Sequence, residues 1–198
     1  MYLKCDYFCR MNFTEDVENC LQVLRSGGTI LYPTDTIWGL GCDATNETAV
    51  KRIYSIKQRE ESKALIVLLA DEREIIKYVA QPDLRVFDYL QNTIQPTTVI
   101  YKGAIGLADN LIAADGSIAI RLVKDEFCRN LIRRFKKPIV STSANISGQP
   151  APPFFSAVNN EIKQAVDYVV NYRRDDETPK QPSSVIIWND DGTVSVLR

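Results

Sequence analysis

Short apolar runs of strand length alternate with helical patterns along this chain, and no other feature of the sequence limits its possible folds so strongly. Helices are predicted after Thr14 and Asn46, whose side chains can cap a helix, and at 71–79, 83–91 and 125–135. Strands are predicted at 29–33, 64–69, 97–101, 117–122, 138–141, 166–170, 184–188 and 193–197. Because strands alternate with helices and the chain closes on a hairpin, we expect an α/β fold with one twisted, mixed sheet flanked by helices.

The length of 198 residues favours one domain over residues 1–198, because it is enough for one substantial core and short for two. The amino-terminal stretch is charged throughout and lacks the apolar region of a secretory signal. No apolar run approaches the roughly 20 residues that a membrane span needs. We therefore expect a cytoplasmic protein without a membrane segment.

The sequence contains no histidine, and this absence excludes several kinds of chemistry. Ser–His and Cys–His nucleophilic sites and all His-ligated metal sites are ruled out. None of the five cysteines lies in a C-x-x-C motif, so a zinc ribbon or redox motif is not indicated. Any reaction must use Lys, Arg, carboxylates, hydroxyls and backbone groups. A net charge of −1 argues against nucleic-acid binding by the whole surface.

Two predicted strands end in hydroxyl-rich loops. Thr34-Asp35-Thr36 follows the first strand directly after Pro33, and Ser141-Thr142-Ser143 comes at the end of the strand that starts at Pro138. Each loop also has a purely local explanation, as a turn or a helix cap. In an open α/β sheet, however, ligands bind at the carboxyl ends of strands. The second interpretation is therefore a ligand site formed by both loops.

A cluster of cations lies between the second helix and the strand at 64–69. Lys57, Arg59 and Lys63 fall within seven residues. Cations at a helix end complement the helix dipole, and this explanation needs no ligand. Alternatively the cluster binds a polyanion, with the arginine gripping two phosphate oxygens and the lysines acting as point charges.

Four motifs, in this order, resemble the YrdC/TsaC family from about residue 14 to the end. They are PTDTIWGLG at 33–41, IKQREESKALIVLL at 56–69, GSIAIRL at 116–122 and PIVSTSANISGQP at 138–150. Members of this family make L-threonylcarbamoyladenylate from L-threonine, bicarbonate and ATP, with release of pyrophosphate. The product supplies the N6-threonylcarbamoyl group of adenosine 37 in tRNA. The resemblance implies a YrdC-like sheet with a concave, cationic cleft.

The resemblance also implies roles for particular residues. Lys57 and Arg59 would be catalytic. The residues expected to bind ATP are Lys57, Arg59, Lys63, Ser117, Ser143 and Arg198. The residues expected to bind threonine are Thr36, Arg121, Ser141 and Ser183, with Arg121 holding the carboxylate. A Mg²⁺ ion would arrive on the phosphates of ATP, and no protein ligand for it is predicted.

The chain departs from the family pattern at several positions. Glu60 and Ala64 replace common prolines, and Trp38 replaces a common tyrosine. Leu68 stands where the longer, two-domain members have a histidine that helps to bind threonine. The chain thus resembles the short form, which works with separate partners, namely a TsaD-type transferase and its accessory proteins.

Two other functions fit the same resemblance. The domain could bind double-stranded RNA or tRNA without catalysis, or it could be a carbamoyl-transfer relative of the hydrogenase-maturation type. The acidic net charge and the lack of aromatic stacking motifs disfavour the first. The second requires zinc-finger and acylphosphatase-like domains for which the chain has neither room nor cysteine pairs.

Overall fold

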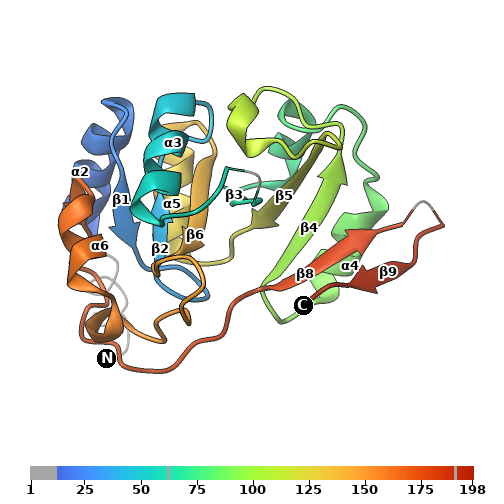
Figure 1. The fold of residues 1–198 in the computed structure, drawn as a ribbon. Coiled ribbons are helices and arrows are strands. Elements are labelled where there is room, and N and C mark those ends of the chain that lie inside the picture. The colour runs from blue at the N-terminus through green and yellow to red at the C-terminus, as the bar shows by residue number, and fades with distance from the viewer. Residues whose placement is uncertain (1–12, 62, 190) are drawn as a thin grey trace.

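A mixed sheet of nine strands runs through the part of the chain that the computed structural model describes, residues 13–61, 63–189 and 191–198 (Figure 1). The strands are β1 (Ile30–Tyr32), β2 (Gly39–Gly41), β3 (Ile66–Leu69), β4 (Thr97–Lys102), β5 (Ser117–Leu122), β6 (Ile139–Ser143), β7 (Tyr168–Val169), β8 (Ser184–Trp188) and β9 (Val194–Val196). Their order across the sheet is β7-β1-β2-β6-β3-β5-β4-β8-β9. The pairs β1–β7, β3–β5 and β4–β8 are parallel and the others are antiparallel. The expected mixed α/β sheet is confirmed.

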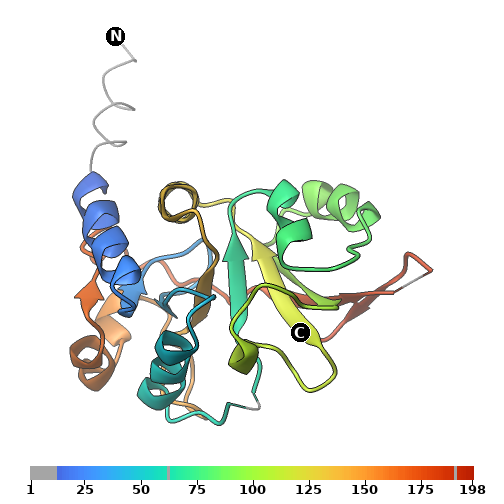
Figure 2. The ribbon, with the colours of Figure 1, turned by 90° about the horizontal axis from the view of Figure 1, so that it is seen from above.

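Helices cover the sheet unevenly. They are α2 (Thr14–Arg25), α3 (Glu47–Ile56), α4 (Arg85–Asn92), α5 (Glu126–Phe135) and α6 (Asn160–Ala165), with short 3₁₀ helices η1 (Glu72–Lys77), η2 (Asp109–Leu111) and η3 (Phe155–Ala157). Seen from above, α5, η1 and α4 lie on one side of the sheet and α3 on the other (Figure 2). In Figure 1 no helix lies in front of β4 and β8, so this part of the α3 side is open.

Most of the predicted elements are present, and the exceptions have local causes. The residue before α2 is Phe13, and no side chain caps this helix, so the prediction that Thr14 caps it is wrong. Phe13 is buried, with its ring 5.7 Å from Phe127 and 5.2 Å from Tyr172, so packing places the start of the helix. Asn46 does cap α3, accepting a hydrogen bond from the amide of Ala49. The predicted helix at 71–79 is the shorter 3₁₀ helix η1.

The sequence patterns did not predict β2, which nevertheless completes the hairpin that displays the first polar loop. Its three residues are all buried, and Gly41 sits under the ring of Tyr32. A Cβ atom at Gly41 would lie 2.6 Å from that ring and 2.8 Å from the carbonyl oxygen of Val140. The hydroxyl of Tyr32 donates to the same carbonyl at 3.2 Å. A glycine at position 41 therefore lets β1, β2 and β6 pack closely.

None of the helices in the described residues is both long enough and apolar enough to span a bilayer.

Candidate active site

A cleft of about 180 Å³ lies on the α3 side, where β2, β6, β3 and β5 are neighbours. Seven of the ten residues predicted for the site line it: Thr36, Arg59, Arg121, Ser141, Ser143, Ser183 and Arg198. The strand register brings them together, because Leu68 pairs with Arg121, Ile66 with Ser141 and Gly39 with Ser143. Both hydroxyl-rich loops thus meet at one cleft.

Arg121 and the Thr34-Asp35-Thr36 loop form the buried end of the cleft. The Nη1 atom of Arg121 donates to Thr36 Oγ1 at 3.0 Å, and Nη2 lies 3.2 Å from Asp35 Oδ1. Thr34 fixes the loop, since its Oγ1 accepts from the amide of Thr36 at 3.0 Å and donates to the carbonyl of Ile37 at 2.7 Å. The same residues therefore form a local turn and part of the lining of the cleft.

One donor of Arg121 has no partner. The residue is only 3% exposed, and its Nε is buried without a hydrogen bond in the described structure. A buried guanidinium donor left unpaired is costly unless a ligand satisfies it. Because Ser141 and Thr36 line the same cleft, this end can bind a carboxylate beside hydroxyl groups.

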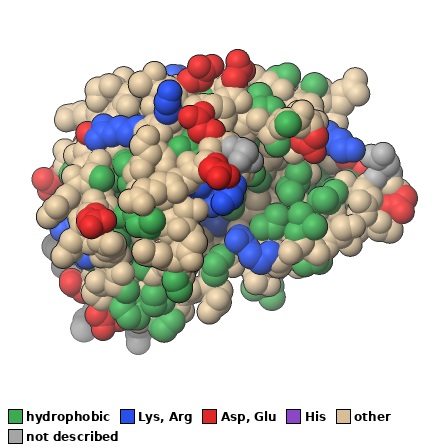
Figure 3. All heavy atoms as spheres, viewed as in Figure 1, with side chains coloured by type: hydrophobic (Ala, Val, Ile, Leu, Met, Phe, Trp, Pro, Cys, Tyr) green, Lys and Arg blue, Asp and Glu red, His purple; other side chains and the backbone are tan. Residues whose placement is uncertain are grey.

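Two further arginines, Arg59 and Arg198, line the cleft. Arg59 is held by the carbonyl of Ala64, to which its Nη2 donates at 3.0 Å, and Arg198 donates twice to the carbonyl of Ser183, at 3.3 and 3.1 Å. Within the described residues no Asp or Glu side chain lines the cleft, and none forms an ion pair with Arg59 or Arg198. Figure 3 shows Lys and Arg side chains in the hollow at the middle of this face. The cleft is therefore suited to a polyanion.

Lys57 lies beneath the serine-rich loop and does not line the cleft. It is 1% exposed, and its Nζ donates to the carbonyls of Ser143 at 2.5 Å and Asn145 at 2.8 Å. Its own carbonyl accepts from the amide of Ser147 at 2.8 Å. Burial, and to a smaller extent the charge of Arg59, lowers the pKa of Lys57 to about 8. The structure thus places Lys57 where it supports the loop that carries Ser143.

Two other predicted residues also lie outside the cleft lining. Lys63 is exposed, on the loop before β3. Ser117 lines a separate hollow of about 370 Å³ together with Tyr101 and Lys102. Ser117 and Arg121 still share one face of β5, because side chains alternate along a strand.

Sequence reasoning gave no role to two residues of the cleft region. Trp38 lines the cleft, and its ring lies 4.7 Å from that of Phe155, which fixes one wall. Asp35 pairs with Arg121 from behind the cleft. The polar break after Pro33 was the available signal for Asp35, but its pairing partner is 86 positions further along the chain and no local pattern reveals it.

These features define a class: an α/β protein whose mixed sheet carries an arginine-rich, hydroxyl-lined cleft at the ends of its central strands. The Sua5/YciO/YrdC family model, described as "Telomere recombination", matches residues 22–198. The chain belongs to this family.

Relatives from bacteria agree with that assignment. A protein of Idiomarina loihiensis named threonylcarbamoyl-AMP synthase is 34% identical over 147 residues, covering 73% of this chain and 79% of its own. A protein of the same name from Pseudoalteromonas translucida is 30% identical over 178 residues, covering 88% and 94%.

Solved structures share the fold. P. abyssi Sua5 in complex with L-threonine has a TM-score of 0.81 at 23% identity. The match covers 93% of this chain, which spans about half (54%) of that protein. E. coli YciO gives a TM-score of 0.76 at 23% identity and covers 93% and 88% of the two chains.

Proposed function

We propose that this protein synthesises L-threonylcarbamoyladenylate from L-threonine, bicarbonate and ATP, releasing pyrophosphate, for N6-threonylcarbamoylation of adenosine 37 in tRNA. One observation carries the proposal: a cleft with no Asp or Glu side chain among its described lining residues joins a buried arginine–threonine pair to two more arginines. An amino acid's carboxylate and a triphosphate are the anions that such a cleft can hold side by side. Relatives named threonylcarbamoyl-AMP synthase support the same reaction.

The reaction needs no enzyme nucleophile, which suits a chain without histidine. The amine of threonine takes up CO₂ derived from bicarbonate and becomes a carbamate. A carbamate oxygen then attacks the α-phosphorus of ATP, and the bond to the leaving pyrophosphate breaks. Positioning of the reactants is the main contribution left to the protein, and it can supply roughly 7–11 kcal/mol.

In this proposal the two ends of the cleft have different tasks. Arg121, Thr36 and Ser141 hold threonine at the buried end, and Ser183 lies at its border. Arg59 and Arg198 neutralise the charge that develops on the phosphates, and Ser143 contacts the nucleotide. Lys57 acts by holding the loop of Ser143.

ATP is too large for a cavity of about 180 Å³, so the rest of the nucleotide must extend beyond the cleft. The open face of β5 is the available path, since Ser117 lies on it four residues, or about 13 Å, from Arg121. We therefore propose that Ser117 contacts the nucleoside end of ATP. Lys63, exposed beside Arg59, is proposed to meet the outer phosphates.

Mg²⁺ enters this proposal as part of the substrate, MgATP. The described residues contain no cluster of three or more Cys, Asp or Glu side chains that could hold a metal, and no Asp or Glu side chain among them lines the cleft. Mg²⁺ in such sites is bound mostly by phosphate oxygens and water. The protein residues would act on the phosphates and not on the metal.

The adenylate would be passed to a TsaD-type transferase, assisted by accessory proteins, which places the threonylcarbamoyl group on tRNA. Incubation with unmodified tRNA, ATP, threonine and bicarbonate should then leave adenosine unmodified, and addition of the transferase set should modify it. Mass spectrometry of nuclease-digested tRNA measures both. Modification by this protein alone would contradict the division of labour.

The reaction itself is tested with labelled bicarbonate. The expected result is a labelled adenylate together with pyrophosphate release that requires threonine, bicarbonate and Mg²⁺. Equal ATP turnover without threonine would contradict the proposal and favour the hydrogenase-maturation alternative. Salt-sensitive RNA binding with no turnover would favour the RNA-binding alternative. Serine should react less well, because loss of a methyl contact costs roughly 1–3 kcal/mol.

A further inference from the structure

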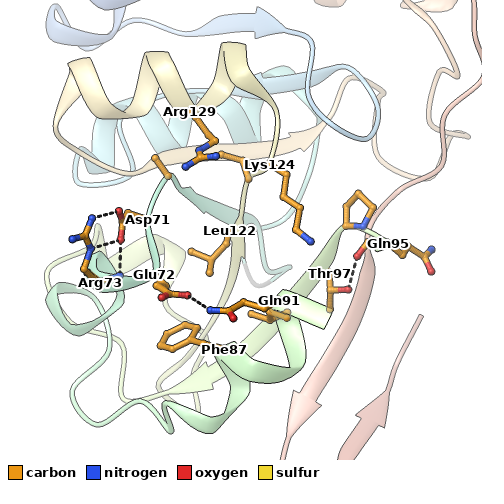
Figure 4. A pocket seen from close by; sticks show the side chains of 14 residues that line it. Asp71, Glu72, Arg73, Phe87, Gln91, Gln95, Thr97, Leu122, Lys124 and Arg129 are labelled. Carbon is orange, nitrogen blue, oxygen red and sulfur yellow. Dashed lines mark hydrogen bonds and ion pairs between the residues drawn. The ribbon is translucent and has the colours of Figure 1, made fainter. Parts of the chain in front are cut away.

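A second and larger pocket, of about 490 Å³, lies on the opposite side of the sheet from the cleft (Figure 4). It lies between η1, α4 and α5 and includes Leu122 of β5. Leu122 follows Arg121, so its side chain points to the other face of the strand. The pocket is thus separate from the proposed ATP and threonine site.

The floor of this pocket is apolar. Leu122, Phe87 and Leu90 line it, and Figure 4 shows Leu122 and Phe87 on either side of the Glu72–Gln91 hydrogen bond. Its volume falls within the range of pockets that hold small organic ligands, roughly 300–1,000 Å³. A simple inorganic ion would make no contact with this apolar surface, so a complementary ligand must have an apolar part.

The charged side chains at the pocket differ in their partners. Asp71 and Arg73 neutralise each other through two side-chain hydrogen bonds, of 2.9 and 2.6 Å. Glu72 forms no ion pair in the described structure and accepts from the amide of Gln91 at 3.5 Å. Arg129, on α5, forms no ion pair in the described structure, and its Nε is buried without a hydrogen-bond partner. A second cation, Lys124, donates from its Nζ to the carbonyl of Thr93 at 2.8 Å and pairs with no carboxylate of the described residues.

We propose that this pocket binds an amphipathic organic anion, whose carboxylate or sulfonate pairs with Arg129 and whose apolar body packs on Leu122 and Phe87. A charged donor pair over an apolar floor is complementary to such a molecule and to neither a purely apolar ligand nor a bare phosphate. Lys124 adds a second positive charge at the same side (Figure 4).

Anilinonaphthalene sulfonate, an aromatic anion that fluoresces when buried, is the probe for the test. The folded protein should bind it saturably at one site, and Arg129→Gln should weaken binding about tenfold or more, because a charge-assisted hydrogen bond is lost. Arg133→Gln is the matched control, since Arg133 is exposed one turn further along α5 and does not line the pocket. The uncharged analogue phenylnaphthylamine should bind wild type more weakly than the sulfonate does, and it should bind Arg129→Gln and wild type equally.

A second variant tests the proposal even if Arg129→Gln does not fold. Gln91 is exposed and lines the pocket, so Gln91→Trp should fill the pocket and abolish binding while the melting temperature stays unchanged. Arg59→Ala, in the cleft, should bind the probe as wild type does. Undiminished binding by both Arg129→Gln and Gln91→Trp, or loss of binding in Arg59→Ala, would overturn the proposal.

Discussion

Three arginines line the cleft, and they are held in two different ways. Arg121 is buried against a carboxylate and a threonine, whereas Arg59 and Arg198 are anchored by backbone carbonyls. A carbonyl orients a guanidinium without neutralising its charge, so the last two arginines keep their full attraction for an anion. This difference agrees with the roles proposed for them, in which Arg121 binds the carboxylate of threonine and Arg59 and Arg198 bind phosphates.

Substitution of Arg59 tests whether this residue binds phosphate or only stabilises the fold. We expect Arg59→Ala to lower turnover at least tenfold, about 1.4 kcal/mol, and to weaken ATP binding far more than AMP binding. Steady-state kinetics and calorimetric titration measure the two effects. Lys51→Ala, exposed on α3, serves as control. A lower melting temperature with no kinetic change would mean that Arg59 only stabilises the end of α3.

The test of Arg121 is its replacement by lysine, because removal of all charge would leave Asp35, whose side chain is only 12% exposed, without its ion partner. Arg121→Lys keeps the charge but loses the forked donors that hold a carboxylate. The threonine KM should rise more than tenfold while the ATP KM changes little. An unchanged threonine KM would remove Arg121 from the amino-acid site.

Lys57 makes stability depend on pH in an unusual direction. Its pKa is lowered from 10.5 to about 8 by burial, so between these values the unfolded chain binds more protons at this position than the folded one. The free energy of unfolding should therefore rise with pH over this range, relative to Lys57→Met, by up to about 3 kcal/mol. Urea unfolding of both proteins at several pH values measures the difference. Parallel curves for the two proteins would show that Lys57 keeps its ordinary pKa.

At the scale of elements, the polar loop after β1 depends on the narrow strand that follows it. β2 consists of two glycines around a leucine and lies between β1 and β6. Such a strand leaves room for Tyr32 and brings the loop of Thr36 beside Ser141 and Ser143. The geometry of the cleft thus depends on residues without functional side chains.

Gly41→Ala should destabilise the protein by about 1–3 kcal/mol, because the added methyl group overlaps the Tyr32 ring and the Val140 carbonyl. Val196→Ala, on the exposed edge strand β9, should change stability by less than about 0.5 kcal/mol. Chemical denaturation measures both. If the two variants prove equally stable, a methyl group at position 41 fits between Tyr32 and Val140, contrary to the structure.

Elements with a clear pattern could be predicted from the sequence, and those defined by their neighbours could not. The alternation in Ser117–Leu122 gave the bounds of β5 correctly, and the capping side chain of Asn46 gave the start of α3. β2 was missed because three residues between loops contain no period, and α6 was missed because it has only six residues. The motifs indicated which residues gather at the cleft. They could not predict that the side chain of Lys57 is buried, because its partners are carbonyls 86 and 88 positions further along the chain.

At the scale of the whole molecule, the labelling rates of three cysteines can show whether the structure unfolds locally or as a whole. Cys20, Cys42 and Cys128 are free and buried, and burial raises the pKa of each thiol. Thiolates react and thiols do not, so labelling requires unfolding around each residue. We expect the three to label at one common rate under native conditions, as mass spectrometry of labelled peptides would show. Faster labelling of one residue would reveal that its part of the sheet opens independently.

The outer pairing of β1 has a consequence for how the chain is made. β1 pairs in parallel with β7, joining Ile30 to Tyr168, and β4 pairs with β8. A ribosome must therefore synthesise most of the protein before either strand can acquire its last neighbour. Contacts so distant in sequence slow folding, because long loops must close before any pairing is gained. Until then the unpaired edges of β1 and β4 are exposed to other chains, so this protein should depend on chaperones during synthesis more than a helical protein of its length.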